Sequence, residues 1–125
     1  MSQVTEYSFG YDPILVRKYV DAVKGGKLLD LTGFTDDTIK AGHVIIRDTA
    51  TQSVYKPMPV STGAYAALPD GYEYVGINIA TVLATEPLVS ILTIGEVNEN
   101  VMPYPITSIK SALKAAVPTI VFAHD

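Results

Sequence analysis

The stretch that decides the fold covers residues 95–122 and reads GEVNENVMPYPITSIKSALKAAVPTIVF. Its beginning, 95–100, predicts that a buried strand stops there, since Asn and Gly favour turns. Apolar residues then recur at helical spacing and predict an amphipathic helix over 105–117: Ile106, Ile109, Leu113 and Val117. Pro118 ends that helix, and 119–123 is typical of a final strand. The pattern indicates packing rather than catalysis.

Length and composition restrict the class of protein. The chain has 125 residues, 48% of them hydrophobic, and a mean hydropathy of +0.25, which favours one domain around one core. It has no cysteine, which excludes disulfides, and its formal net charge of −4 argues against a nucleic-acid partner. Its start lacks the features of a signal peptide, and no apolar run is long enough for a membrane span. We therefore expect neither nucleic acid nor membrane as a partner.

The first part of the chain predicts an arm followed by a helix. Tyr7, Phe9 and Tyr11 alternate, so residues 1–11 form either an edge strand or an arm that becomes ordered on a partner. Asp12 and Pro13 are typical of a helix start. Residues 12–24 then carry apolar side chains at helical spacing, namely Val16, Tyr19, Val20 and Val23. A glycine pair at 25–26 would end this helix. We expect one domain over 12–125, with this helical element at 12–26.

The middle of the chain predicts antiparallel strands. Strands are expected at 27–31, 43–48, 75–80 and 88–94, the last as the most buried, and a tight turn at 68–72. Prolines 57 and 59 place 54–60 at a sheet edge or in a polyproline-like run. The expected core is Val44, Ile46, Val75, Ile77, Ile79, Ile91, Ile94, Ile109, Leu113, Ile120 and Phe122. The fold class is thus α+β: a small, mostly antiparallel β-rich domain with two short helices.

Side chains with reactive chemistry do not form a recognisable set. Neither His43 nor His124 belongs to a ligand pair, so a structural or solvent role is favoured over catalysis or metal binding. Glu96 and Glu99 suggest turn capping rather than an acid–base pair, because no nucleophile accompanies them. The tyrosines fit contact surfaces and ordinary strand composition equally well. We expect no enzyme activity, metal or cofactor.

Several segments together resemble one family. GHVI at 42–45, leading to KPMP at 56–59, looks like its opening hairpin, and YVGI at 74–77 is similar to its central strand. IGEVN at 94–98, the helix after it and IVF at 120–122 resemble its closing unit. The family is that of the head decoration proteins of tailed bacteriophages, also called auxiliary or cement capsid proteins, of the lambda type or of head-fibre bases.

The resemblance implies a small β-rich protein, often trimeric, on the outer surface of the virion. Such a protein is made in the bacterial cytoplasm and clamps neighbouring major capsid proteins, often at three-fold positions. Its N-terminal segment adds a strand to a capsid protein, which needs no special side chains. The candidates for capsid contact are Gln3, Val4, Thr5, Glu6, Tyr7, Phe9, Pro57, Met58 and Pro59.

Three other interpretations remain open from the sequence. Residues 1–41 depart from the compact family type and would suit the capsid-anchoring base of a head fibre, with a fibre protein as partner. The tyrosines would suit a carbohydrate-binding module of a phage fibre or a cell surface. A small enzyme would need a pocket with convergent polar groups, which the sequence does not indicate.

Overall fold

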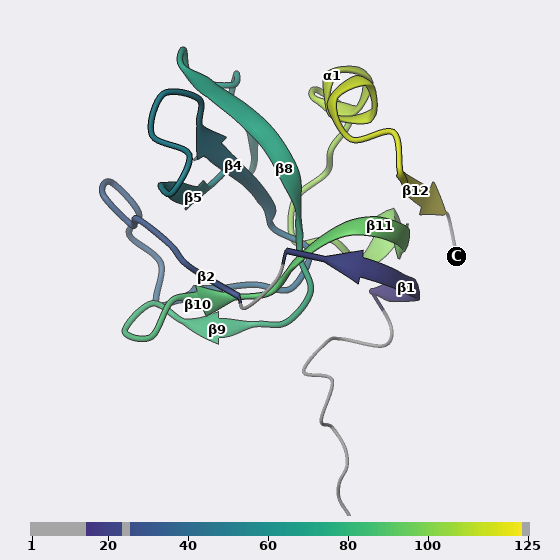
Figure 1. The fold of residues 1–125 in the computed structure, drawn as a ribbon, viewed down its shortest axis with the longest axis horizontal. Helices are drawn as coiled ribbons and strands as arrows, with labels where there is room; N and C mark the ends of the chain where they lie inside the picture. The colour runs from purple at the N-terminus through teal and green to yellow at the C-terminus, as the bar shows by residue number, and fades with distance from the viewer. Residues whose placement is uncertain (1–14, 24–25, 124–125) are drawn as a thin grey trace, which may run out of the picture.

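The computed structural model describes residues 15–23 and 26–123 (Figure 1). The elements are β1 Val16–Ala22, β2 Lys27–Leu28, β3 Thr38–Ile39, β4 Val44–Asp48, β5 Tyr55–Pro57, β6 Val60–Ser61, β7 Ala64–Tyr65, β8 Tyr72–Asn78, β9 Val82–Leu83, β10 Leu88–Val89, β11 Ile91–Asn98, the 3-10 helix η1 Glu99–Val101, α1 Lys110–Ala116 and β12 Ile120–Ala123. The predicted small, mostly antiparallel α+β fold is confirmed. Of the two expected helices, the described residues contain the later one.

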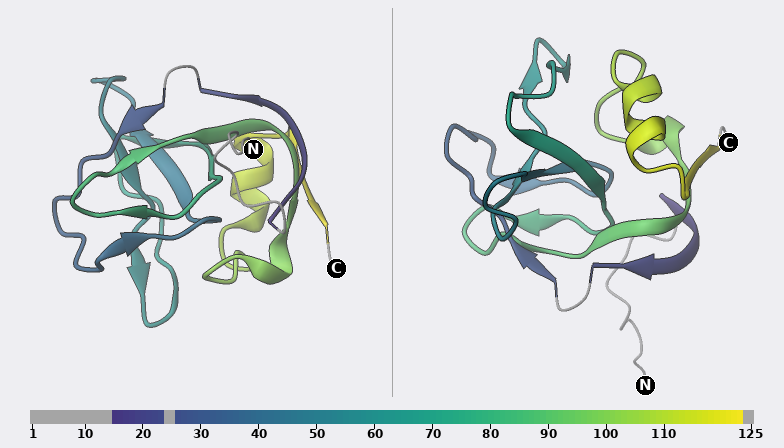
Figure 2. Two further views of the ribbon diagram at one scale, coloured as in Figure 1. Left: turned by 90° about the horizontal axis from the view of Figure 1, so that it is seen from below. Right: turned by 45° about the horizontal axis from the view of Figure 1, so that its top comes forward.

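One main sheet organises the molecule. Its strand order is β1-β11-β8-β4-β5, and β12 lies parallel to β11. Two-stranded pairs, β2 with β10 and β3 with β9, lie beside it at the lower left of Figure 1, and β6 pairs with β7. The views of Figure 2 show α1 inside the curve that β11 and β1 make. The predicted turn before β8 is confirmed: the Tyr72 amide donates to the Pro69 carbonyl, and Gly71 has a φ of +82°.

The helix predicted over 12–24 is wrong where the structure describes it, because Val16–Ala22 forms the edge strand β1. Its Asp12-Pro13 start lies outside the described residues. Tyrosine and the β-branched valines favour strands, and pairing with β11 decides between the two structures. The register of this pairing shifts beside Gly95. A Cβ at Gly95 would clash with the Lys18 carbonyl, so glycine lets β1 approach β11.

The strand expected at 88–94 is divided into β10 and β11, and β11 continues through Gly95 to Asn98 instead of stopping. The α-helical part of 105–117 begins only at Lys110, because the Ile109 amide closes a turn on the Ile106 carbonyl. The expectation of a strand at 27–31 holds for β2 alone. In each case the element was located correctly and its ends were not, since the ends depend on tertiary pairing.

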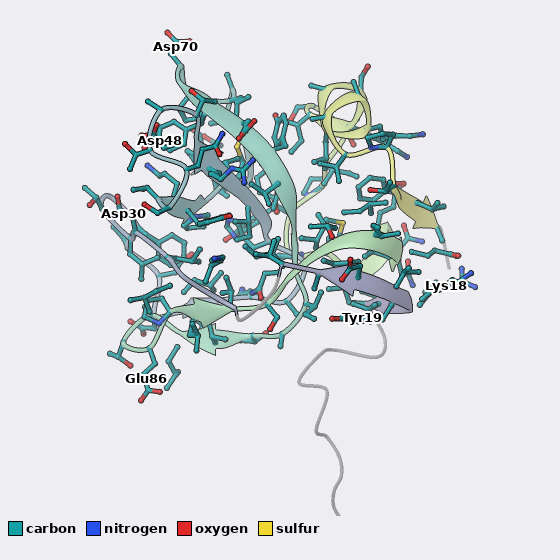
Figure 3. The ribbon with its side chains drawn as sticks, viewed as in Figure 1. Lys18, Tyr19, Asp30, Asp48, Asp70 and Glu86 are labelled. Carbon is teal, nitrogen blue, oxygen red and sulfur yellow. The ribbon has the colours of Figure 1, made fainter. Side chains whose placement is uncertain are left out.

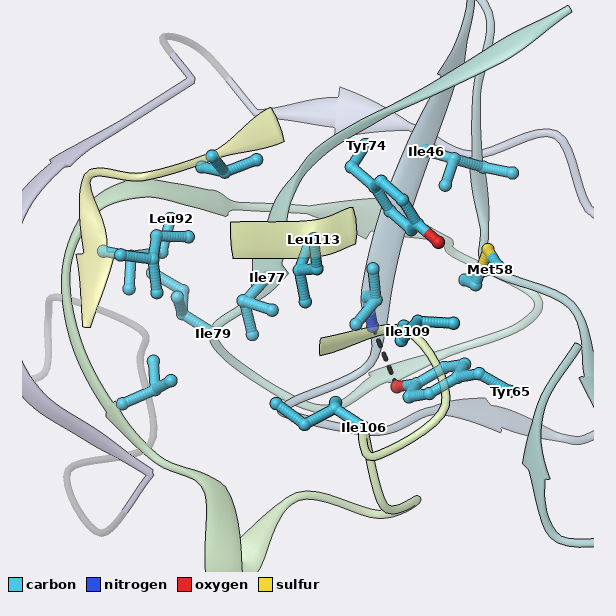
Figure 4. Close-up of a cluster of buried hydrophobic side chains, with 14 of the residues drawn as sticks. Ile46, Met58, Tyr65, Tyr74, Ile77, Ile79, Leu92, Ile106, Ile109 and Leu113 are labelled. Atoms are coloured by element: carbon cyan, nitrogen blue, oxygen red, sulfur yellow. Dashed lines mark hydrogen bonds between the residues drawn. The ribbon is translucent and has the colours of Figure 1, made fainter. Parts of the chain in front are cut away.

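Two apolar clusters cover opposite faces of β4. The larger one, drawn in Figure 4, contains Val44 and Ile46 with Leu113 of α1. The other contains Ile45. Eight of the expected core residues are buried: Val44, Ile46, Ile77, Ile79, Ile91, Ile109, Leu113 and Ile120. Val75 and Phe122 are partly buried against the clusters, whereas Ile94 is exposed and its placement in the core was wrong.

Candidate binding surfaces

The arm candidates Gln3, Val4, Thr5, Glu6, Tyr7 and Phe9 lie outside the described residues. The structure does place the point at which the preceding segment joins the domain. The Leu15 carbonyl accepts a hydrogen bond from the Asn98 amide, and Val16 pairs with Val97. After Val16, which is buried, the next four residues of β1 are exposed. The segment therefore joins the domain at the start of an edge strand, where Leu15 and Val16 are both buried in the larger apolar cluster.

The Pro57-Met58-Pro59 candidates lie at the opposite edge of the main sheet, as predicted from their prolines. Pro57 and Met58 are nevertheless buried, and Met58, which is 1% exposed, belongs to the larger core cluster. The Met58 amide donates to the Val44 carbonyl, and the Pro59 carbonyl accepts from the Ala66 amide. This edge therefore offers little backbone for an added strand.

A cavity of about 330 Å³ lies beside this edge. Its walls come from the 30–36 loop, the residues at and after β5, and Tyr104. The lining residues are Asp30, Thr32, Gly33, Phe34, Thr35, Asp36, His43, Lys56, Pro57, Met58, Pro59, Val60 and Tyr104. The lining residues thus combine apolar and aromatic side chains with two carboxylates, one lysine and the hydroxyls of Thr32, Thr35 and Tyr104.

His43 forms the aromatic base of the cavity and is 3% exposed. Its Nε2 donates to the Met58 carbonyl at 2.8 Å, which makes Nδ1 the acceptor of the neutral ring. The rings of Phe34, Tyr65 and Tyr104 surround it edge-on, with centroids 5.5–6.2 Å away. Burial lowers the pKa of His43, and the Met58 carbonyl and the charge of Asp36 oppose this shift only in part. The structural role predicted for His43 agrees with these contacts; His124 lies outside the described residues.

The tyrosines near His43 are held in the same way. Burial raises the pKa of the Tyr65 hydroxyl, whose oxygen accepts from the Val44 amide at 3.0 Å (Figure 4). Burial, followed by the charge of Asp36, also raises the pKa of Tyr104. Both groups are therefore neutral hydroxyls at physiological pH, and the tyrosines placed at contact surfaces by one interpretation of the sequence include core residues.

Hydrogen bonds fix the outer wall of the cavity. Asp30 donates its amide to the Tyr55 carbonyl at 2.7 Å, and its Oδ1 accepts from the amide and the hydroxyl of Thr32. These bonds, the hydroxyl's first, lower the pKa of Asp30. The Phe34 amide donates to the Leu31 carbonyl, and the Tyr104 hydroxyl lies 3.5 Å from Asp36 Oδ2. Hydrogen bonds therefore attach the 30–36 loop to Tyr55 of β5 and to Tyr104.

Glu96 and Glu99 do not form a common site. Glu96 lies within β11 rather than in a turn, and pairs with Arg17 at 3.3 Å. Glu99 begins η1 and pairs with Lys110 Nζ at 3.0 Å. The predicted capping occurs here, but Asn98 performs it instead of a glutamate: its Oδ1 accepts a hydrogen bond from the Asn100 amide at the start of η1. The separate ion pairs fit structural roles for both glutamates.

Exposed leucines mark another surface. Leu28 and Leu88 are cross-strand partners in the β2–β10 pair and are 66% and 57% exposed. Figure 3 shows this region, with Asp30 and Glu86, on the side of the molecule away from Lys18 and Tyr19 of β1. Sequence reasoning missed Leu88 because it placed 88–94 in a single buried strand, and it assigned no face to Leu28 in the strand expected at 27–31.

Residues 15–23 and 26–123 contain no group of three His, Cys, Asp or Glu side chains that could hold a metal ion. No helix in that part of the chain is long and apolar enough to cross a membrane.

Sequence reasoning also missed the cavity, because its residues are scattered from Asp30 to Tyr104. The available signal was Phe34, the aromatic residue of the 30–36 loop.

Comparisons of the chain with protein-family models, with curated proteins and with solved structures found no match.

Proposed function

We propose that this chain is a non-enzymatic head decoration protein that binds the outside of a bacteriophage capsid and stabilises contacts between major capsid proteins. The observation that carries the proposal is the order of elements behind the family resemblance. The β4–β5 hairpin, the central strand β8 and the unit β11–α1–β12 follow one another in a single fold. These are the segments 42–59, 74–77 and 94–122 from which the resemblance was drawn.

The position of β1 supports attachment through the segment before it. An added strand binds through backbone hydrogen bonds, so an arm needs an extended sequence and a free path to its partner. The alternating Tyr7 and Phe9 supply the pattern. The edge position of β1 allows an arm to engage a capsid protein without disturbing the core. Many copies on one shell would add avidity to a weak single contact.

Deletion of residues 2–9 tests the proposal. The variant should keep the melting curve of the full chain, because the buried clusters lie in 15–23 and 26–123. It should fail to co-sediment with undecorated capsids assembled from the major capsid protein of the same virus. A full-length variant with Tyr7→Ser and Phe9→Ser is the matched control for length, and should bind more weakly than the full chain.

Two results would contradict the proposal at different levels. If the deletion variant binds capsids as the full chain does, attachment does not use the arm, and the exposed Leu28 and Leu88 become the next surface to test. If the full chain never co-sediments with capsids, the decoration function itself is wrong. Sedimentation velocity of the free chain measures whether it forms the trimer that the resemblance implies.

A further inference from the structure

The proposed function leaves the cavity beside β5 without a role. Its volume of about 330 Å³ falls at the lower end of the range for small-molecule sites, roughly 300–1,000 Å³. We propose that this cavity binds a neutral sugar ring, a hexopyranoside unit of a glycan. The assignment uses the isolated chain and does not depend on capsid binding.

The polar lining suits a ligand that both donates and accepts hydrogen bonds. Asp30 and Asp36 supply carboxylate acceptors, and Thr32 and Thr35 supply hydroxyls that do either. Lys56 also lines the cavity, and its Nζ lies over the Tyr72 ring, 5.3 Å from the centroid. A sugar hydroxyl can satisfy each of these groups in turn. Asp30 Oδ1 is already occupied by Thr32, so the carboxylate is oriented before a ligand arrives.

Other classes of ligand fit the lining less well. Two carboxylates in the wall repel an anion such as phosphate, and a free cation would have to compete with Lys56 for them. The described residues also lack the three ligands that a bound metal would need. A wholly apolar ligand would cover Asp30, Asp36 and Lys56 without satisfying them, which is costly. A neutral polyol avoids all of these penalties.

The apolar part of the cavity suits the C–H faces of a pyranose. Phe34 and Tyr104 line it, and edge-on contacts with the buried His43 hold both rings in place, at 6.2 and 5.7 Å between centroids. Aromatic rings carry a negative face that attracts weakly positive C–H groups. Rigid rings lose little entropy on binding, so the walls are organised in advance.

Nuclear magnetic resonance titration of the full chain tests the assignment. The probes are the methyl glycosides of glucose, galactose, mannose and N-acetylglucosamine, each at millimolar concentration. We expect at least one to shift the amides of Gly33, Phe34, Asp36 and Lys56 saturably. The hollow lined by Glu99, Asn100, Thr107 and Lys110, about 270 Å³, is the internal control and should not respond.

Substitution of two neighbouring aspartates, one in the cavity wall and one outside it, distinguishes a direct contact with the ligand from an effect of the loop's overall negative charge. Asp36→Ala removes a lining carboxylate and should weaken glycoside binding about ten-fold, the loss of one good hydrogen bond. Asp37→Ala removes an exposed carboxylate of the same loop that does not line the cavity, and should leave binding unchanged. Asp30→Asn, which keeps an oxygen for Thr32, should weaken binding several-fold while the loop stays folded.

Three outcomes would overturn the assignment. The first is that none of the glycosides shifts the cavity amides. The second is that Asp36→Ala and Asp37→Ala weaken binding equally. The third is that argininamide shifts these amides and the glycosides do not. The last result would make the cavity a receptor for a cationic side chain. Each leaves the capsid co-sedimentation result as it stands, so failure here is distinguishable from failure of the decoration function.

Discussion

The two sides of the main sheet are stabilised by different interactions. On the side of α1, long strands and apolar residues such as Leu113 and Ile77 form the larger cluster, and both side chains are 0% exposed. On the other side, the β2–β10 and β3–β9 pairs are two residues long, and the loop between them depends on bonds from polar side chains. Apolar burial thus supports the helix side, while the loop side combines a smaller core with polar anchors.

The largest effect should come from the helix side. Leu113→Ala removes a fully buried side chain and should lower the free energy of unfolding by roughly 2–5 kcal/mol. The same substitution at Leu88, which is 57% exposed on the loop side, should change it by less than about 1 kcal/mol. Chemical denaturation of both variants measures the contrast. Equal losses would mean that the helix side does not dominate stability.

A smaller effect should come from the polar link between the two sides. Asn78 is 0% exposed, donates to the carbonyls of Ile39 and Lys40, and accepts from the Ala80 amide. Asn78→Ala leaves these groups without their partner and should cost about 1–3 kcal/mol. Hydrogen exchange should accelerate first in β3 and β9. The exposed Asn100 gives a matched Asn100→Ala control, and acceleration spread evenly over both sides would argue against a local polar link.

The smallest effect should be a pH dependence that originates at His43. Its pKa is lowered in the folded state, so between that pKa and about 6.5 the unfolded chain binds more protons. Stability should therefore fall as the pH drops below about 6.5, with Asp36 nearby reducing the loss. His43→Gln keeps an N–H donor for the Met58 carbonyl and does not titrate. Denaturation between about pH 7 and pH 5 should show a flatter dependence for this variant; identical slopes would exclude His43 as the source.

The sequence predicted the parts that depend on local chemistry. Pro69 and Gly71 indicated their turn correctly, Pro57 indicated a sheet edge, and the Ile109–Leu113 spacing indicated a helix. The prediction from sequence failed where pairing with a distant strand determines the secondary structure. Residues 16–22 have apolar side chains at helical spacing, but they form a strand that pairs with β11. The face of Ile94 likewise depends on which elements cover β11.

The cavity was beyond reach for the same reason. Its wall joins Asp30, His43 and Tyr104, which no short pattern connects. At the sheet edge after β5 the sequence predicted the position of the element but not the burial of its side chains. Proline chemistry located it, but only the packed structure shows that Met58 turns into the core.

The pairing of β1 with β11 also sets the timing of folding in the cell. Val16 is synthesised about eighty residues before its partner Val97. The β1–β11 ladder therefore cannot form until most of the chain has emerged, and β12 must emerge later still to lie beside β11. Contacts between residues this distant in sequence slow folding. A nascent chain therefore carries β1 for about eighty residues before its β11 partner is made, a state in which a strand edge is unpaired.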